Sequence, residues 1–227
     1  MRSPPLPRSP EIEALPRPIV TYVGNLELRL DWEILEQVAA TWQGTMALVG
    51  PPGERARARP AARLRAVARS GACAGVPAML AASDVLILPH VVNAMTRGMD
   101  PQKLHEYLAS GRPVVATPVQ GTEAHAELVA IAAQPAAFVR AVHAQLESDS
   151  PALAAQRVAA ALARTWQTVV PAMLDRVLAV VHAGARLKAE RKRRYHSLSR
   201  PEVRALVPAS AVRVLDVGCG TGALGAR

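Results

Sequence analysis

The chain has 227 residues, a formal net charge of +9, and only 3% aromatic residues although half of it is hydrophobic. That length suits one sizeable core, or one domain plus part of another. The basic residues gather in Arg55–Arg69 and Arg186–Arg194 without the interleaved aromatic residues of a single-strand binder. The composition therefore favours a solvated basic surface and no nucleic-acid partner.

Cysteine and histidine, the residues that form disulfides and bind metals, are few and scattered in the sequence. Cys73 and Cys219 are far apart in sequence, and the six histidines do not cluster, which argues against a disulfide framework and a metal site. No uninterrupted apolar run reaches the roughly 18 residues of a membrane span. Residues 1–17 are rich in proline and lack the apolar centre of a signal peptide. The sequence predicts a cytoplasmic protein and leaves peripheral association with a membrane open.

The first part of the chain predicts alternating strands and helices. Ile19–Val23 is a strand that leads into Gly24-Asn25. Asp31 is placed to cap a helix, because apolar residues recur after it at intervals of three and four. Thr45–Val49 is a second strand, closed by a turn of glycine and proline. The Ala- and Arg-rich stretch 55–74 is poorly patterned, and we expect either a divergent helix or a damaged region there.

The alternation continues to about residue 117. Val76–Ala82 predicts a helix, and Asp84–Leu88 and Pro113–Ala116 predict strands. Between these strands, Asp100-Pro101 opens a helix as N-cap and first helical residue. Such an order predicts an α/β fold with a Rossmann-like, doubly wound parallel sheet whose strand ends face one ligand crevice.

Helical patterns follow to the end of this region. We expect helices over 123–133, 135–146, 151–164 and 168–194, with proline at 171 near the start of the last one, where it costs little. The KAERKRR run at 188–194 reads as a charged helix end or a linker between domains.

One segment also resembles a known family. SDVLILP at 83–89, followed by KLHEYLASGRPVVAT at 103–117, is similar to the nucleotide-sugar-binding C-terminal half of GT-B glycosyltransferases of the group 1, family 4-like type. The run IVTYVGNLELRLDWEILEQVA at 19–39 is similar to the first strand, glycine turn and helix of that half-domain. The resemblance implies transfer of a sugar from a nucleoside diphosphate sugar, with retention of configuration and without a metal or other cofactor.

The resemblance implies roles for five residues. Glu106 would accept hydrogen bonds from the ribose hydroxyls, and Lys103 would offer charge to the diphosphate. Gly24 and Asn25 would allow close approach of the backbone, and Arg29 would face the diphosphate. Simpler alternatives stay open: an i, i+3 surface pair of Lys103 with Glu106, and a turn glycine without a ligand at 24.

Other polar residues near the strand ends are weaker candidates. His90 and Asn93 follow the strand 84–88, and either face the donor sugar or belong to an ordinary solvated loop. At Gly121-Thr122-Glu123, helix amides could contact phosphate, although a capping box is the simpler account. Many retaining relatives carry a glutamate where this chain has Gly98, so the donor-sugar carboxylate is missing or comes from elsewhere, such as Asp100. No general base is assigned.

The C-terminal segment changes character. VRVLDVGCGTGALGAR at 212–227 resembles the first motif of class I S-adenosylmethionine-dependent methyltransferases. That resemblance implies an incomplete cofactor site at Asp216, Gly218, Gly220 and Gly222. Alternatively, the segment is unstructured in this chain.

These observations give a four-part organisation. We expect a proline-rich linker at 1–17, the GT-B C-terminal domain at 18–183, a basic helical linker at 184–205 and a truncated methyltransferase start at 206–227. The predicted function is glycosyl transfer to an unknown acceptor, and we expect this chain to be inactive without an acceptor-binding Rossmann-like domain. The alternatives are methyl transfer as the main activity of a longer product, and a non-catalytic or decayed nucleotide-binding fragment.

Overall fold

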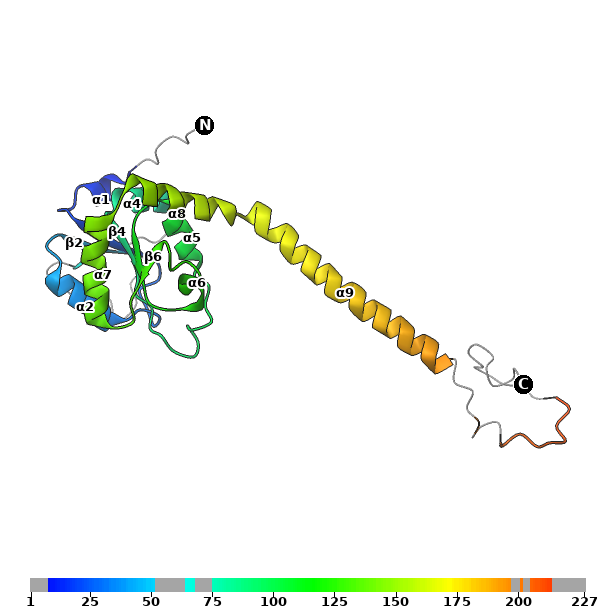
Figure 1. The fold of residues 1–227 in the computed structure, drawn as a ribbon. Coiled ribbons are helices and arrows are strands. Elements are labelled where there is room, and N and C mark those ends of the chain that lie inside the picture. The colour runs from blue at the N-terminus through cyan, green and yellow to red at the C-terminus, as the bar shows by residue number, and fades with distance from the viewer. Residues whose placement is uncertain (1–7, 52–63, 68–74, 197–200, 202–204, 214–227) are drawn as a thin grey trace. The chain divides into compact units, whose positions relative to one another are not determined.

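A computed structural model of the protein describes residues 8–51, 64–67, 75–196, 201 and 205–213 (Figure 1). The chain divides into two compact units, Met1–Thr165 and Trp166–Arg227. The first unit contains an α/β domain, and the second contains one long helix. The domain limits expected at 17/18, 183/184 and 205/206 stay predictions.

The first unit is built on a sheet of six parallel strands in the order β3-β2-β1-β4-β5-β6. Strands β1, β2, β4 and β5 are buried along their whole length, which explains their continuous apolar sequences. The predicted Rossmann-like parallel sheet is therefore confirmed. The strands are β1 (Ile19–Val23), β2 (Thr45–Val49), β3 (Leu64–Val67), β4 (Val85–Leu88), β5 (Val114–Ala116) and β6 (Val129–Ile131).

Helices cover both faces of the sheet (Figure 1). Helix α2 packs against α7 on one face, and α5 packs against α8 on the other. Asp31 caps α2 as predicted, since its carboxylate accepts a hydrogen bond of 3.2 Å from the N–H of Ile34. The helices of this unit are α1 (Pro10–Glu13), α2 (Trp32–Thr41), α4 (Val76–Ala82), α5 (Gln102–Ala109), α6 (Gln120–Glu123), α7 (Pro135–Ser148) and α8 (Pro151–Ala163).

Two predicted elements are wrong. Leu64–Val67 forms a strand that pairs with β2, where the sequence suggested a divergent helix or a damaged region. The helix expected over 123–133 is instead the short α6 followed by strand β6, which pairs with β5. In both cases the hydrogen bonds offered by a neighbouring strand override a weak local pattern.

The start of α5 also differs from the prediction. Pro101 is the N-cap, in an extended conformation, and no side chain caps the helix. The carboxylate of Asp100 instead pairs with Arg164 and lies 3.6 Å from Nε2 of His105. Arg164, which is distant in sequence, therefore binds the Asp100 carboxylate that the local sequence pattern assigned to helix capping.

The second unit contains α9 (Trp166–His196). The helix begins two residues earlier than expected, so Pro171 is its sixth residue and removes a hydrogen bond beyond the first turn. An 18-residue window of α9 has a mean hydropathy of 1.3, which makes the helix, by length and composition alone, long and apolar enough to cross a membrane. The sequence pattern did not predict such a segment because Asp175 and Arg176 interrupt the apolar run.

Candidate functional site

The candidate site lies where the winding of the sheet reverses direction. Strands β1 and β4 are neighbours, and the chain leaves β1 toward β2 but leaves β4 toward β5. Open parallel sheets bind ligands at the carboxyl ends of the strands beside such a point. Here β1 ends at Val23 and β4 ends at Leu88. Gly24 and His90, which follow these strands, are therefore well placed to contact a ligand.

Gly24 is required by its surroundings. Its φ is +150°, and a Cβ at this position would lie 2.1 Å from Cε of Lys103. The N–H of Gly24 donates a hydrogen bond of 2.7 Å to the carbonyl of Val49. A side chain would be strained and would also displace the lysine, so glycine allows Lys103 to lie against the end of β1.

Tyr107 fixes α5 to the end of the same strand. The N–H of Val23 donates a buried hydrogen bond of 2.7 Å to the hydroxyl of Tyr107. Burial raises the pKa of the Tyr107 hydroxyl well above its ordinary value, so the group stays protonated. Lys103 lies one turn before Tyr107. This buried contact therefore positions the part of α5 that carries the lysine.

Lys103 is held beside Tyr22. Its Nζ donates a hydrogen bond of 3.4 Å to the Tyr22 hydroxyl and lies 5.4 Å from the centre of the ring. Burial lowers the pKa of Lys103, the charge of Arg29 lowers it further, and Glu106 acts in the opposite direction. Two cations that disfavour each other's charge create a site that would be stabilised by an anion.

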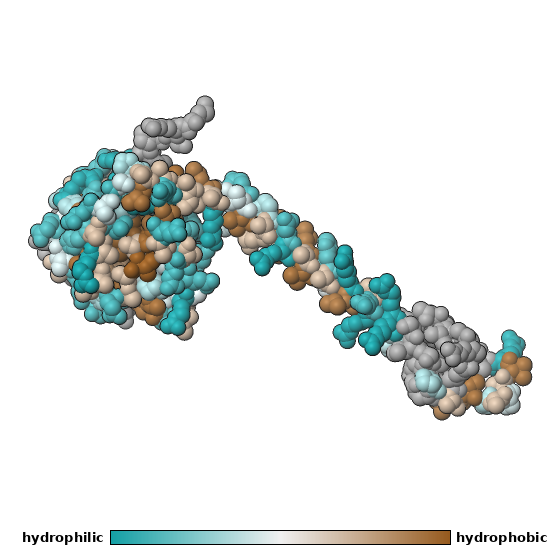
Figure 2. Space-filling model, in the orientation of Figure 1, coloured by the Kyte–Doolittle hydropathy of each residue, from teal (hydrophilic) through white to brown (hydrophobic). Residues whose placement is uncertain are grey.

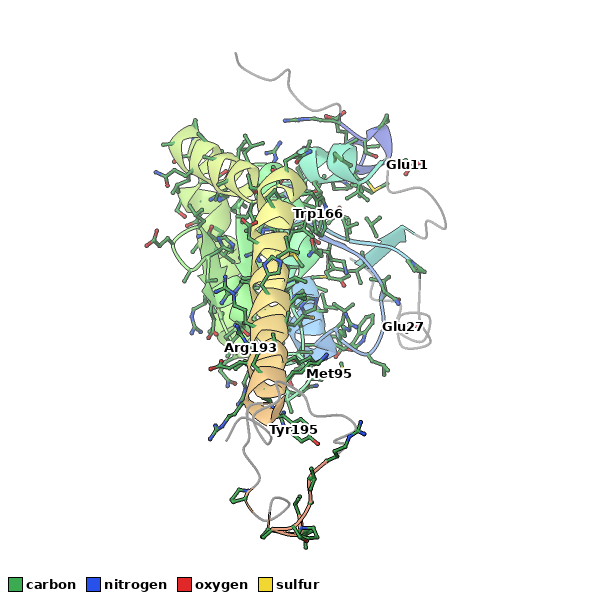
Figure 3. All side chains as sticks on the ribbon, turned by 90° about the vertical axis from the view of Figure 1, so that its right-hand side faces the viewer. Glu11, Glu27, Met95, Trp166, Arg193 and Tyr195 are labelled. Carbon is green, nitrogen blue, oxygen red and sulfur yellow. The ribbon has the colours of Figure 1, made fainter. Side chains whose placement is uncertain are left out.

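A hollow of about 680 Å³ opens beside Lys103. Glu27 and Met95, labelled in Figure 3, lie on two of the loops that surround it. Its volume is within the usual range for a small-molecule site. The residues that line it are Tyr22, Asn25, Glu27, Leu28, Arg29, His90, Met95, Met99, Asp100, Pro101, Gln102 and Lys103.

His90 supplies a neutral polar group to this hollow. Burial lowers its pKa to about 4, and the charges of Lys103 and Arg29 contribute in the same direction. Its main chain is fixed by Thr117, whose hydroxyl accepts from the His90 N–H at 3.0 Å and donates to the His90 carbonyl at 2.7 Å. Its buried Nδ1 has no hydrogen-bond partner among the described residues. The imidazole is therefore able to bond to a ligand.

A second hollow of about 530 Å³ lies on the other side of Lys103. Val76, Pro77 and Leu80 from α4 give it an apolar wall, and Glu106 from α5 and Ser110, the C-cap of α5, add polar groups. The exposed Glu106 points to this hollow and not into the packed interior. Lys103 lines both hollows and so lies at their junction.

The structure brings the five predicted site residues to one edge of the sheet. Asn25 and Arg29 line the larger hollow, Gly24 and Glu106 line the smaller one, and Lys103 lines both. In the part of the chain that the structure describes, no ion pair includes Arg29 or Lys103. The resulting site has an apolar section with a carboxylate, a cationic centre and a section lined by both polar and apolar residues.

Several weaker candidates have structural roles instead. The Asn93 side chain accepts hydrogen bonds from the N–H groups of Met95 and Thr96 and so shapes its own loop. The N–H of Gly121 donates to the Met99 carbonyl, which removes it as a phosphate ligand. Thr122, rather than an acidic residue, accepts from the Val119 N–H at 3.0 Å.

The sequence suggested Asp100 as a replacement for the carboxylate that is missing at Gly98. Asp100 does line the larger hollow, but its carboxylate is engaged by Arg164. Sequence reasoning missed Tyr22, a polar-tipped residue in a largely apolar strand, which is a usable signal, and Tyr107, which lies on the buried side of the amphipathic helix α5. The residues Asp216, Gly218, Gly220 and Gly222 lie outside the described part of the chain. Among the described residues, no cluster of three metal-ligating side chains exists.

Comparisons with known proteins bear on the family and the fold of the chain. Residues 17–148, more than half of the chain, match the sequence profile of the family described as glycosyl transferases group 1. No curated protein gives a sequence match.

Solved structures share the fold at low sequence identity. HepE from Anabaena, in complex with UDP and glucose, has a TM-score of 0.54 and 17% identity over 71% of this chain and 48% of its own. Sucrose-phosphate synthase from Thermosynechococcus elongatus has a TM-score of 0.56 and 20% identity over 75% of this chain and 47% of its own. Trehalose 6-phosphate synthase from Burkholderia multivorans has a TM-score of 0.57 and 16% identity, over 79% and 45%. The chain thus spans about half the length of these proteins.

Proposed function

Because the chain belongs to the glycosyl transferases group 1 family, we propose that it binds a nucleoside diphosphate sugar and serves as the donor half of a glycosyltransferase. The observation that carries the proposal is the position of Lys103 between two hollows. A nucleotide sugar has a diphosphate between its nucleoside and its sugar. One cation at the junction, with Arg29 nearby, therefore matches the order of groups along such a ligand.

The two hollows differ in the way the two ends of that ligand differ. The apolar wall of Val76, Pro77 and Leu80 suits a base, and the Glu106 carboxylate beside it suits the two hydroxyls of a ribose. The larger hollow, with neutral His90 and Asn25, suits a sugar. HepE, a structural neighbour, is in complex with UDP-glucose, and we choose uridine nucleotides as the first ligands to test.

The contribution of this chain to catalysis would be electrostatic. As the bond between the sugar and the diphosphate breaks, negative charge grows on the diphosphate. Lys103 and Arg29 would stabilise that charge within a partly buried site. We further propose that a second Rossmann-like domain binds the acceptor and that transfer retains the anomeric configuration, in a cytoplasmic location. The second domain and the retention of configuration follow from the family resemblance, and the location follows from the two cysteines without paired spacing.

The proposal is tested by thermal shift with UDP and 2′-deoxy-UDP. We expect UDP to stabilise the chain more than the deoxy nucleotide, and we expect the Glu106→Ala variant to lose that preference. The matched control is Glu127→Ala, at an exposed position away from both hollows. If UDP still stabilises Glu106→Ala more than 2′-deoxy-UDP does, the proposed ribose contact is wrong. If no nucleoside diphosphate raises the melting temperature of the wild-type chain, the proposed donor site is wrong.

A second candidate function rests on the VLDVGCGTG motif at 214–222. We propose that residues 206–227 form the first segment of a methyltransferase cofactor site, which needs further strands to bind the cofactor. S-adenosylhomocysteine should then leave the melting temperature of this chain unchanged. A clear stabilisation would show instead that these residues already bind the cofactor.

A further inference from the structure

Helix α9 has an apolar surface that no described residue of its own unit covers. It has 31 residues, and none of its 18-residue apolar window is buried. Ten of its large hydrophobic side chains are exposed: Trp166, Val170, Met173, Leu174, Val177, Leu178, Val180, Val181, Leu187 and Tyr195. A surface of this kind requires a partner, because exposed contiguous apolar area is costly in water.

Most of the large apolar residues of α9 share one side of the helix. Thr168, Asp175 and His182 recur at every seventh residue and therefore form a polar line along the axis. At about 100° per residue, the large apolar side chains between 166 and 187, except Leu178, lie in the half of the circumference opposite that line. Figure 2 shows brown and pale residues, with teal ones between them, along the first part of α9 and a cluster of teal residues at its C-terminal end.

The C-terminal end of α9 carries a dense positive charge. Residues 186–194 contain six basic residues and one glutamate, so this segment has a net charge of +5. In sequence, these charged residues come directly after most of the apolar ones. Because they are nearly consecutive, their side chains project around the whole circumference of the helix. Trp166 and Arg193, labelled in Figure 3, lie near opposite ends of α9.

We propose that α9 binds the surface of an anionic lipid bilayer. Its apolar half would enter the boundary between headgroups and acyl chains, and the basic end would contact acidic headgroups. A wide apolar face next to a basic cluster is the pattern of helices that lie in this interface. Tryptophan at the start of the apolar face is suited to the same region.

Two other environments for the apolar half of α9, the bilayer interior and a second copy of the helix, fit it less well. A helix that crosses the bilayer would place Asp175 and Arg176 near the bilayer centre, where ionisable groups are costly. A two-stranded coiled coil covers only a narrow seam and would leave much of a half-circumference exposed. In its parallel form it would also bring two segments of charge +5 together.

The test is binding of the full chain to vesicles of phosphatidylcholine with or without phosphatidylglycerol, measured by co-sedimentation and tryptophan fluorescence. Trp166 is 67% exposed, whereas Trp32 and Trp42 are 6% and 1% exposed. We therefore expect a blue shift from Trp166 on binding, and its absence from Trp166→Phe. Binding should be stronger to the acidic vesicles and should weaken with added salt.

Neighbouring positions of α9 provide matched variants. Val181→Asp alters the apolar half and His182→Asp alters the polar line, with the same introduced residue in the same turn. We expect Val181→Asp to weaken vesicle binding by about tenfold or more, because it loses a buried side chain and adds a charge, and His182→Asp to change it by less than about twofold. Lys188→Gln combined with Lys192→Gln should weaken binding to acidic vesicles by about tenfold.

Three results would overturn the proposal. The first is a chain that stays in the supernatant with acidic vesicles although circular dichroism shows an intact helix. The second is equal binding by Val181→Asp and His182→Asp. The third is a stable dimer in solution, measured by light scattering, that Val181→Asp dissociates while acidic vesicles have no effect.

Discussion

At the scale of single residues, the site depends on the close fit between Gly24 and Lys103. Gly24→Ala would place a Cβ 2.1 Å from the lysine Cε at a φ of +150°. We expect the lysine to be displaced, with a loss of about 1–3 kcal/mol in unfolding free energy and of about tenfold in affinity for UDP. The measurements are urea unfolding and calorimetric titration.

The matched control for this substitution is Gly184→Ala in α9, where a new Cβ would meet nothing within 4 Å. A helical alanine is favoured over glycine by about 1 kcal/mol, so this variant should keep or gain stability. Equal UDP affinity in Gly24→Ala and the wild type would show that Lys103 does not need the space above Gly24.

Lys103 should give UDP binding a characteristic dependence on pH. Its pKa is lowered from 10.5 by burial and by Arg29, so it loses its charge at a lower pH than an ordinary lysine. The affinity advantage of the wild type over Lys103→Gln should therefore fall as pH rises, and it should do so below pH 10.5. The ratio of the two affinities compares two proteins with the same ligand, so the effect of pH on the ligand itself cancels. A constant ratio up to that pH would contradict the account.

His90 should affect stability on the acid side. Its pKa is about 4 in the folded chain against an ordinary 6.5, so between these values the unfolded chain binds more protons. The contribution of the neutral His90 to the free energy of unfolding is present above pH 6.5 and is lost as pH falls toward 4. The size of this contribution is on the order of 3 kcal/mol. His90→Gln should lose less stability than the wild type over this window in urea unfolding, whereas parallel profiles would show an ordinary histidine.

At the scale of elements, Arg157 connects α8 to the turn after α5. It is 1% exposed, and its guanidinium donates to the Gly111 carbonyl at 2.9 Å and to the Asp149 carboxylate at 2.8 Å. This contact holds the C-terminal end of the helix that carries Lys103 and Glu106. Because α5 must be fixed at both ends, Arg157 supports the site without touching it.

Arg157→Met should therefore destabilise the chain by about 2–4 kcal/mol, because it leaves a buried carbonyl unpaired and Asp149 without its cation. The control is Arg140→Met, at an exposed position in α7, which should change the unfolding free energy by less than about 0.5 kcal/mol. Similar losses for both variants in chemical unfolding would show that the ion pair has no special importance.

The elements also show what could be predicted from the sequence. β1, β2 and β4 are continuous apolar runs bounded by turn residues, and their bounds followed from that pattern almost to the residue. β3 and β6 could not be predicted because each depends on pairing with a neighbouring strand. The edge residues Glu106 and Lys103 were predicted from a family motif, whereas the contacts of Lys103 with Tyr22 and Gly24 depend on packing between distant segments.

At the scale of the whole molecule, all described residues that line the proposed donor site belong to the first unit, Met1–Thr165. A chain that ends at Thr165 should keep the UDP affinity of the full chain within about twofold, and it should lose binding to acidic vesicles. Calorimetry and co-sedimentation check these two properties separately. Loss of UDP binding with an intact circular dichroism spectrum would show that the second unit contributes to the site.

The most direct test of the donor site is a crystal structure of the chain with UDP-glucose. The account predicts the diphosphate within hydrogen-bond distance of Nζ of Lys103, the uridine against Val76, Pro77 and Leu80, and the ribose hydroxyls on Glu106. The glucose should occupy the hollow beside His90. A ligand bound away from this edge of the sheet, or bound with its base beside His90, would contradict it.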